Sequence, residues 1–378
     1  ATSKNPHDVM KAFVHLPQVK EVLMHGPTKS SIVIREGLQV DLRVVEDESY
    51  GAALAYFTGS KEHNIRLREM AVKKGLKINE YGIFREKDNK KLGGKDENDV
   101  YKILGMQFIP PEMRENRGEI EAAQKNTLPR PVELGDIKGD LHVHTKQSDG
   151  SHTLEELIDA ARERGYGYIA ITDHSKGLGI ARGLSEERLL EEKKEVDALN
   201  KKLRGFKLLM GIEVDIRSDG RMDFDDDILS KMDIVVASIH SGFRQPEEQL
   251  TRRIVSAMKN PYVSIIAHPT GRLIGERDAY EIDMEQVLNM ASETGTALEI
   301  NAYPLRLDLS DVYVKQAKEL GVKFAISTDT HVITQFDYMH YGVSIARRGW
   351  LEKKDVLNTL KYDTLMKNLQ RKRRKISP

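Results

Sequence analysis

Histidine and carboxylate side chains recur at the ends of apolar segments in the last two thirds of the chain. The first are His142 and His144, which lie two residues apart in a strand-like segment and so share one face. Asp149 follows in a turn that ends at Gly150. Imidazoles and a nearby carboxylate are ligands that divalent metal ions accept. On this segment alone, ordinary surface or core histidines are an equally good interpretation.

Five later apolar segments also end in a histidine or an acidic residue. In chain order these residues are His174, Glu213, His240, His268, and the pair Asp329 and His331. A lone histidine at such a position is more often structural, but chance would scatter the 12 histidines of the chain. The combined set exceeds the four ligands that one zinc ion takes. We predict two or three divalent ions, bridged by Glu213 and Asp329, with zinc, manganese or iron as suitable metals.

Strands and helices that alternate would position these residues. The strand-like segments are Asp140–His144, Tyr168–Thr172, Lys207–Val214, Ile234–His240, Val263–His268, Ala297–Asn301 and Lys323–Asp329. The helix-like segments are Thr153–Arg164, Ser185–Leu203, Pro246–Lys259, Asp283–Glu293 and Ser310–Leu320. This order predicts an α/β fold with a parallel sheet, and a closed barrel is favoured over an open doubly wound sheet. The carboxyl ends of barrel strands meet at one mouth, so the candidate ligands should converge.

Basic residues follow the same strand ends. They are Lys146, Lys176, Arg182, Arg217, Arg244 and Arg272. Each one singly is more often a solvated charge. As a ring around a metal site, they predict contacts with the phosphates of a nucleic acid.

The first third predicts a smaller α+β unit. A helix-like stretch precedes three strand-like stretches, and these segments are Asp8–Phe13, Val19–Met24, Ser31–Arg35 and Leu38–Val45. In the last strand Gln39, Asp41 and Arg43 share a polar face, which is either part of a site or an ordinary solvated face. Further along the chain, Asn64 and Arg68 lie one helical turn apart.

Composition limits the protein class. The 378 residues suffice for two or more domains. Lys+Arg and Asp+Glu both total 59, so any nucleic-acid footprint must be local. Without cysteine, disulfides and thiolate metal sites are excluded. No apolar run is long enough to span a bilayer, so we expect a soluble cytoplasmic protein without a membrane partner. The abrupt start suggests a fragment of something longer.

Residues 39–84 resemble the palm and thumb of the family X DNA polymerases. The resemblance implies that the tripeptide around Asp41, which includes Arg43, carries the third carboxylate of a magnesium site. It places Tyr56, Phe57 and Gly59 at the sugar of an incoming dNTP, Asn64 at its minor-groove edge and Arg68 at the template side. Nothing before Asp41 supplies the other two carboxylates, so polymerisation is expected of the parent protein and not of this piece.

The candidate ligands resemble the full ligand set of the PHP (polymerase and histidinol phosphatase) family, which implies a distorted seven-stranded barrel with three metals. The resemblance groups His142, His144, Glu213 and Asp329 at one ion, Glu213, His240 and His268 at the second, and Asp149, His174 and His331 at the third. A polymerase thumb joined to such a domain resembles the bacterial and archaeal family X arrangement.

These expectations lead to one hypothesis and two alternatives. The hypothesis is metal-dependent hydrolysis of DNA phosphodiesters as a 3′–5′ exonuclease, extending to abasic sites or 3′ phosphates. Its catalytic residues would be His142, His144, Glu213 and Asp329. Its substrates would be single strands, 3′ ends and gapped repair intermediates. The alternatives are a small phosphomonoesterase like histidinol phosphatase, and a DNA-binding module with a structural metal cluster.

The expected organisation has five parts. They are a partial palm (1–46), a thumb (47–115), a linker with a short helix (116–138), the PHP barrel (139–362) and a disordered basic tail (363–378). The linker is expected because prolines at Pro110, Pro111, Pro129 and Pro131 interrupt a polar stretch.

Overall fold

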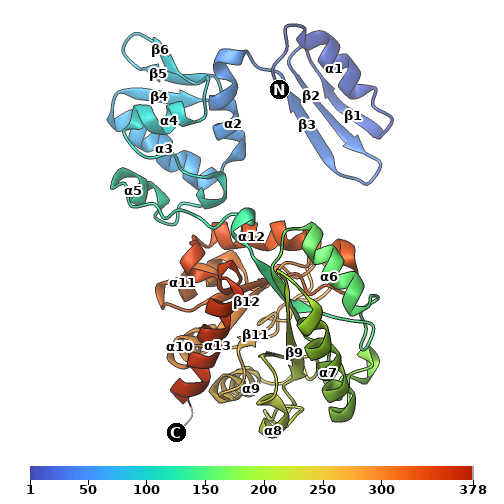
Figure 1. Cartoon of the computed structure of the whole chain (residues 1–378). Coiled ribbons are helices and arrows are strands. Elements are labelled where there is room, and N and C mark those ends of the chain that lie inside the picture. The colour runs from blue at the N-terminus through green and yellow to red at the C-terminus, as the bar shows by residue number, and fades with distance from the viewer. Residues whose placement is uncertain (377–378) are drawn as a thin grey trace. The chain divides into compact units, whose positions relative to one another are not determined.

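The structure, a computed structural model, describes residues 1–376, with side chains described through Gln370 (Figure 1). It divides into two compact units, one from Ala1 to Leu128 and the other from Pro129 onward. The second unit carries the candidate metal ligands, and each unit is described by itself below.

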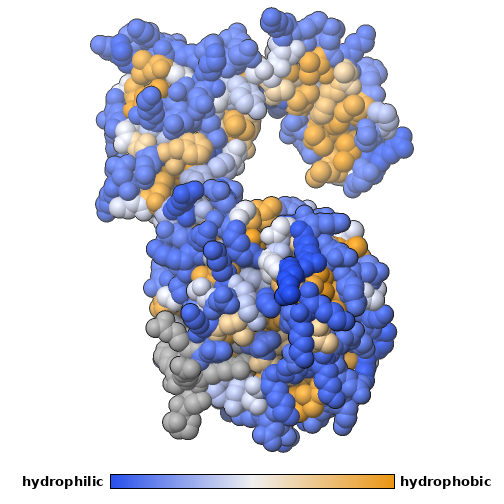
Figure 2. All heavy atoms as spheres, in the orientation of Figure 1, coloured by the Kyte–Doolittle hydropathy of each residue, from blue (hydrophilic) through white to orange (hydrophobic). Residues whose placement is uncertain are grey.

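The first unit opens with a helix and an antiparallel sheet, in the residues where a partial palm is expected. The strand order is β1-β2-β3, and β1 pairs only with β2 among the described strands. Val22, Leu23 and Met24 of β1 are 45%, 48% and 39% exposed, and Figure 2 shows an apolar patch over this sheet. The elements are α1 (Pro6–Val14), β1 (Val19–His25), β2 (Lys29–Ile34) and β3 (Gln39–Arg43).

Helices and a second small antiparallel sheet make up the rest of the first unit. A side chain at Gly51 would place its Cβ 2.1 Å from the carbonyl carbon of Asp96, so the loop before α4 packs directly on α2. The elements are α2 (Tyr50–Thr58), α3 (Lys61–Lys73), β4 (Leu76–Asn79), β5 (Gly82–Arg85), β6 (Lys91–Gly93), α4 (Asn98–Leu104) and α5 (Glu119–Gln124).

The expected linker is mostly packed structure. Its short helix is present as α5, where the buried Glu119 accepts a 2.6 Å hydrogen bond from Nδ1 of the buried His63 on α3. Further along, the buried Val132 donates its backbone N–H to the carbonyl of Leu351. Residues 116–128 therefore pack with the first unit and the residues from Val132 with the second, in contrast to the expected linker over 116–138.

The second unit is a nearly closed barrel of seven parallel strands. The order β13-β12-β11-β10-β9-β8-β7 follows the chain, and every neighbouring pair is parallel. The ring closes where His144 N–H donates to the carbonyl of Thr330 at 2.9 Å. The predicted barrel is confirmed, with strands β7 (Gly139–Val143), β8 (Tyr168–Ile171), β9 (Lys207–Asp215), β10 (Ile234–Ser238), β11 (Ile265–Ile266), β12 (Ala297–Asn301) and β13 (Phe324–Ser327).

Helices surround the strands (Figure 1). The five predicted helices are α6 (Leu154–Glu163), α7 (Glu186–Lys202), α9 (Glu247–Lys259), α10 (Met284–Thr294) and α11 (Asp311–Glu319). Three more were not predicted, namely α8 (Asp226–Leu229), α12 (Met339–Arg348) and α13 (Tyr362–Ile376). Helix α13 corrects the expected disordered tail, because its Leu365 and Leu369 are buried; residues 377 and 378 and the side chains from Arg371 lie outside the described residues.

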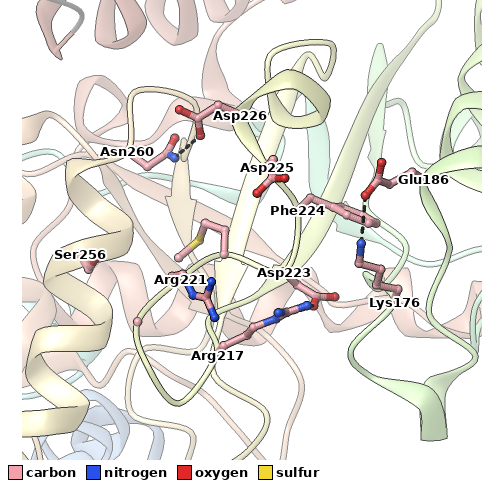
Figure 3. A pocket seen from close by; sticks show the side chains of 12 residues that line it. Lys176, Glu186, Arg217, Arg221, Asp223, Phe224, Asp225, Asp226, Ser256 and Asn260 are labelled. Atoms are coloured by element: carbon pink, nitrogen blue, oxygen red, sulfur yellow. Dashed lines mark hydrogen bonds and ion pairs between the residues drawn. The ribbon is translucent and has the colours of Figure 1, made fainter.

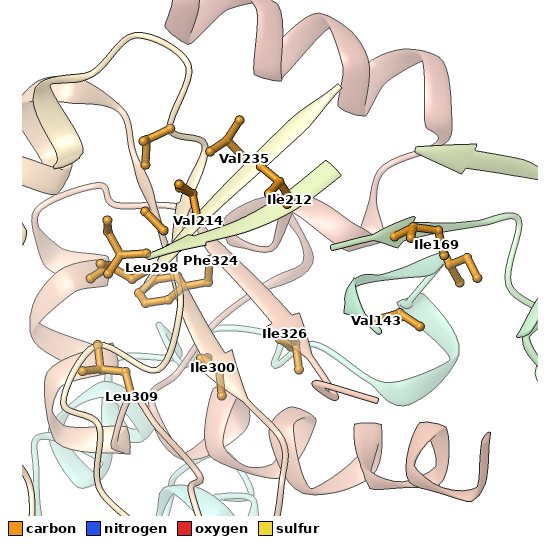
Figure 4. Close-up of a cluster of buried hydrophobic side chains, with 14 of the residues drawn as sticks. Val143, Ile169, Ile212, Val214, Val235, Leu298, Ile300, Leu309, Phe324 and Ile326 are labelled. Carbon is orange, nitrogen blue, oxygen red and sulfur yellow. The ribbon is translucent and has the colours of Figure 1, made fainter. Parts of the chain in front are cut away.

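Two apolar clusters fill the second unit, one on each face of the strands. Met210, Ile212 and Val214 of β9 belong to the larger cluster, which packs under the helices (Figure 4). Leu209 belongs to the smaller cluster, which takes residues from all seven strands and so lies inside the ring. Because successive strand residues alternate faces, Glu213 points inward like Leu209. The barrel interior is thus polar at the carboxyl ends of its strands and apolar over the rest of their length.

Candidate metal centre

The predicted ligands meet at the carboxyl ends of the strands. Glu213 is the centre of the arrangement, because its carboxylate faces five imidazoles from four other strand ends, including Nε2 of His144 at 3.7 Å from Oε2. Its Oε1 lies 3.1 Å from Nε2 of His268 and 3.3 Å from Nε2 of His240. Its Oε2 lies 2.9 Å from Nδ1 of His174 and 3.4 Å from Nε2 of His142.

The remaining predicted ligands complete the cluster on its other side. Nε2 of His144 lies 3.0 Å from Oδ1 of Asp329. Asp149 faces His331 at 3.3 Å and His174 at 3.5 Å. The structure therefore brings together every side chain that the sequence proposed as a metal ligand.

Three groups of donor atoms within the described residues could each hold a metal ion. Within each group the donor atoms lie within 4.8 Å of one another. The groups are His142 with His144 and Asp329; His174 with Glu213 and His240; and His144 with Asp149, His174 and His331. This grouping differs from the one that the resemblance implies in three ways. Glu213 is absent from the first group, His144 and His174 each belong to two groups, and His268 contacts the second group through Glu213.

Buried polar atoms without partners show that the site fits metal ions. Nε2 of His142 and Nδ1 of His144 have no hydrogen-bond partner among the described residues, although both side chains are fully buried. Leaving such atoms unpaired is costly, and a coordinated cation would satisfy them. Imidazole and carboxylate donors without thiolate suit zinc, manganese or iron.

Electrostatics supports the same conclusion. Burial alone would raise the pKa values of Glu213 and Asp329, but the imidazoles around them hold both pKa values well below the ordinary range. Burial lowers the pKa of His144 to about 4, and repulsion from His331 adds to the effect. The carboxylates are therefore ionised and His144 is neutral at pH 7, which are the protonation states that bind metal.

The raised pKa of His174 indicates that its ring carries a proton at a position where a metal ion could bind. Burial lowers its pKa, but Glu213 and Asp149 outweigh that effect and raise the pKa to about 10. A divalent ion between these groups would displace the proton, so metal binding should release protons.

A second layer of carboxylates and amides orients the ligands. Glu299 accepts a 2.8 Å hydrogen bond from Nδ1 of His142 and another of 2.8 Å from the backbone N–H of His268. Asn301 donates to both Glu299 and Asp329 at 3.1 Å. Sequence reasoning missed Glu299 because only the last residue of each strand was considered, although Glu299 and Asn301 share the inward face of β12.

The loop that carries Asp149 is held by a buried carboxylate. Asp173 accepts from the backbone N–H of Thr145 at 2.8 Å and from the Ser148 hydroxyl. A side chain at Gly150 would place its Cβ 2.4 Å from the carbonyl oxygen of His144, so the loop returns directly onto the strand end.

The predicted ring of cations is only partly available to a substrate. Figure 3 shows a pocket of about 430 Å³ in which Lys176 pairs with Glu186 at 2.9 Å. In the same pocket, Arg217 pairs with Asp223 at 2.7 Å. Internal carboxylates thus neutralise two cations that were expected to bind phosphate.

The other four predicted cations divide into two kinds. Arg272 donates to the carbonyl oxygens of Arg306, at 2.7 Å, and Leu307, so it braces the loop after β12. Lys146, Arg182 and Arg244 are exposed and form no ion pair within the described part of the chain. Sequence reasoning missed Arg306, which is 16% exposed and whose Nε lies 3.8 Å from Oδ2 of Asp329.

In the first unit, part of the expected polymerase site comes together. Asp41, Arg43 and Phe57 line a pocket of about 380 Å³, with the guanidinium of Arg43 5.2 Å from the centre of the Phe57 ring. Asp41 is exposed, and a hydrogen bond from Ser31 lowers its pKa.

The remaining expected polymerase residues lie outside that pocket. Asn64 donates at 2.7 Å to the carbonyl of Tyr56, which holds α3 against α2. Gly59 joins these helices with a φ of 76°, a left-handed conformation that favours glycine. Arg68 is exposed on α3.

Within the described residues, no helix combines the length and apolarity needed to cross a membrane.

Comparisons with known proteins match a part of each unit. Residues 53–115 match the family model of the DNA polymerase beta thumb, and residues 140–303 match that of the PHP domain. The DNA polymerase/3′-5′ exonuclease PolX of Bacillus subtilis is 45% identical over 356 residues, which cover 94% of this chain and 62% of that protein. The chain thus spans less than two thirds of the length of that relative.

A smaller relative and one solved structure match the second unit. A probable phosphatase of Thermoanaerobacter sp. is 33% identical over 248 residues, which cover 63% of this chain and 96% of that protein. The crystal structure of a histidinol phosphate phosphatase from Lactococcus lactis, complexed with zinc, L-histidinol and phosphate, aligns at a TM-score of 0.43 and 16% identity, covering 56% of this chain and 94% of that one. The chain therefore belongs to the PHP family, and joins its PHP domain to a DNA polymerase beta thumb as the PHP-containing family X DNA polymerases do.

Proposed function

We propose that this chain is a metal-dependent phosphodiesterase that removes nucleotides from DNA 3′ ends. The observation that carries the proposal is the convergence of nine metal-type side chains at the barrel mouth, with Glu213 at their centre. The name of the Bacillus subtilis relative, a DNA polymerase/3′-5′ exonuclease, supports DNA as the substrate and the 3′–5′ direction. The same chemistry extends to abasic sites and to 3′ phosphates.

The residues of the chain have distinct roles in this proposal. His142, His144, Glu213 and Asp329 would hold the metal ions nearest the reaction. Divalent ions bound here supply Lewis acidity and lower the pKa of a water molecule, with zinc, manganese or iron as candidates. Arg306, beside Asp329, is positioned to bind a phosphate oxygen and to balance charge that develops in the transition state.

Polymerisation is not proposed for this chain. Asp41 is the one carboxylate that the resemblance assigns to a magnesium site, and two-metal nucleotide transfer needs three. We propose magnesium-dependent use of dNTPs only for a protein that supplies all three carboxylates, whereas gapped DNA is also a proposed substrate of the nuclease.

A small phosphomonoesterase is the second candidate. It is favoured by the probable phosphatase whose sequence the chain covers almost completely. A single test separates it from the nuclease and from a DNA-binding module with a structural metal cluster. The chain, loaded with manganese, is incubated with a 5′-labelled single strand and, separately, with histidinol phosphate.

The nuclease proposal predicts stepwise shortening of the strand from its 3′ end. The double variant His142→Ala/His144→Ala should lose this activity by at least a thousandfold, whereas His340→Ala, which removes an exposed histidine of α12, should not. Turnover of histidinol phosphate alone would favour the phosphatase. DNA binding without any turnover would favour the structural metal cluster, and unchanged nuclease activity in the double variant would end the proposal.

A further inference from the structure

Three arginines, Arg272, Arg277 and Arg306, lie in the loops that follow β11 and β12, and the first two form no ion pair among the described residues. Arg272 donates only to backbone carbonyls, and Nε and Nη2 of Arg277 donate to the carbonyl of Gly271 at 3.0 and 2.7 Å. Among the described residues, no carboxylate forms an ion pair with either side chain. Lys176 and Arg217, by contrast, are each neutralised by a carboxylate. The loops after β11 and β12 are therefore the side of the mouth that attracts an anion.

Arg306 connects this side to the metal centre. Its Nε lies 3.8 Å from Oδ2 of the candidate ligand Asp329. Arg277 donates to the carbonyl of Gly271, and the next residue, Arg272, donates to the carbonyl of Arg306, so hydrogen bonds join the loops that carry Arg277 and Arg306. Asp329, Arg306 and Arg277 thus form a path that leads away from the centre.

At the end of this path, Arg277 lies over an aromatic ring. Its guanidinium carbon is 4.3 Å from the centre of the Phe243 ring. Phe243 in turn stacks on Tyr280, with ring centres 5.9 Å apart and planes 13° from parallel.

The stack is anchored to the same strand end as the metal centre. The Tyr280 hydroxyl donates at 2.8 Å to the carbonyl of Pro269, the residue after His268. A side chain at Gly271 would bring its Cβ within 2.3 Å of the Tyr280 ring, so this residue must be glycine for the stack to form. The position of Arg277 relative to the centre is therefore fixed by packing.

We propose that Arg277 and Phe243 form a second nucleotide subsite, which holds the nucleotide next to the scissile phosphate. This inference rests on the proposed nuclease function. A planar guanidinium on an aromatic ring offers a surface on which a base can stack. Nη1 of Arg277 has no hydrogen-bond partner among the described residues and can donate to the next phosphate. Because every base has a π-face, the subsite should accept all sequences.

The test compares two substrates that differ in the second nucleotide. The p-nitrophenyl ester of thymidine 5′-monophosphate contains a phosphodiester but only one nucleoside, whereas a 5′-labelled oligothymidylate reaches the proposed subsite. Arg277→Ala, Phe243→Ala and the conservative Phe243→Tyr are measured on both substrates in the full chain. Arg252→Ala is the matched control, since this exposed arginine of α9 pairs with Glu248 and with no other carboxylate of the described residues.

Arg277→Ala and Phe243→Ala should lower kcat/KM on the oligonucleotide by at least about tenfold, mainly through KM, while the ester changes less than about twofold. Phe243→Tyr, which keeps the ring, should stay close to the unsubstituted protein. Equal losses on both substrates would show that the stack only supports the metal-site loop, and no loss on either would show that no nucleotide binds there. Either result overturns the subsite. If the unsubstituted chain cleaves the ester but never the oligonucleotide, the DNA substrate itself is wrong, and the subsite falls with it.

Discussion

At the residue scale, the orientation of His142 depends on a single carboxylate. Nδ1 of His142 donates to Glu299, which leaves Nε2 to face the candidate metal centre. Glu299 uses one oxygen for this bond and the other for the backbone of His268 and the amide of Asn301. A glutamine has one acceptor oxygen and cannot satisfy all these donors.

Glu299→Gln should therefore weaken metal binding by about 10- to 100-fold, as is typical when a partner of a ligating histidine is changed. Metal titration of the apo chain measures the effect. The exposed Glu281→Gln serves as the control, since it makes the same chemical change outside the centre. Equal affinity in the Glu299 variant and the unsubstituted chain would show that His142 needs no such orientation.

The sequence was informative about residues whose position in a strand follows a rule. His142, His174 and Asp329 could be predicted as neighbours because parallel strands bring their carboxyl ends together. Partners of side chains could not be predicted this way: nothing local in the sequence shows that Lys176 is neutralised by Glu186 or that Arg306 approaches Asp329. These contacts depend on loop paths that no periodicity encodes.

At the element scale, helix α13 closes the apolar end of the barrel. Its Leu365 and Leu369 belong to the cluster inside the ring of strands. Sequence reasoning assigned residues 363–378 to a tail because the basic run from Arg371 concealed a short apolar stripe. Strands were easier to predict, since each continuous apolar run here is bounded by polar loops.

Leu365→Ala should lower the free energy of unfolding by about 2–5 kcal/mol, the usual cost of removing a buried leucine side chain. Denaturant unfolding followed by circular dichroism measures this change. Lys367→Ala, an exposed position of the same helix, should stay within about 0.5 kcal/mol of the unsubstituted chain. Equal stability of the two variants would show that α13 does not contribute to the apolar core.

The junction of α3 and α5 is also testable at this scale. Burial acts to raise the pKa of Glu119, but the hydrogen bond from His63 and backbone donors outweigh burial and lower the pKa. Because the folded pKa lies below the ordinary value of 4.5, ionised Glu119 contributes stability above that pH and loses it as the pH falls through the folded pKa.

Glu119→Gln should therefore destabilise the first unit at pH 7, and its difference from the unsubstituted chain should shrink as the pH falls below 4.5. Thermal unfolding of the two proteins over a pH series measures the loss of stability at pH 7 and its decrease at lower pH. If the stability difference between the two proteins grew as the pH falls, ionised Glu119 would not be the form that stabilises the fold.

At the scale of the whole molecule, the chain combines a DNA polymerase beta thumb with a PHP domain whose predicted ligands are all present. The two units have separate apolar cores and could be distinguished from the sequence by a change from a small α+β pattern to a βα repeat. Their boundary was harder to predict, because α5 looks like a linker helix until Glu119 is seen to be buried against His63.

The most direct test of the account is the number of metal ions bound per chain. Inductively coupled plasma mass spectrometry of the full chain, purified without chelator, should find two or three equivalents of zinc, manganese or iron. Glu213→Gln should lose at least one equivalent, because this carboxylate faces five of the imidazoles. Less than one equivalent in the unsubstituted chain, or the same content in both proteins, would contradict a shared metal centre.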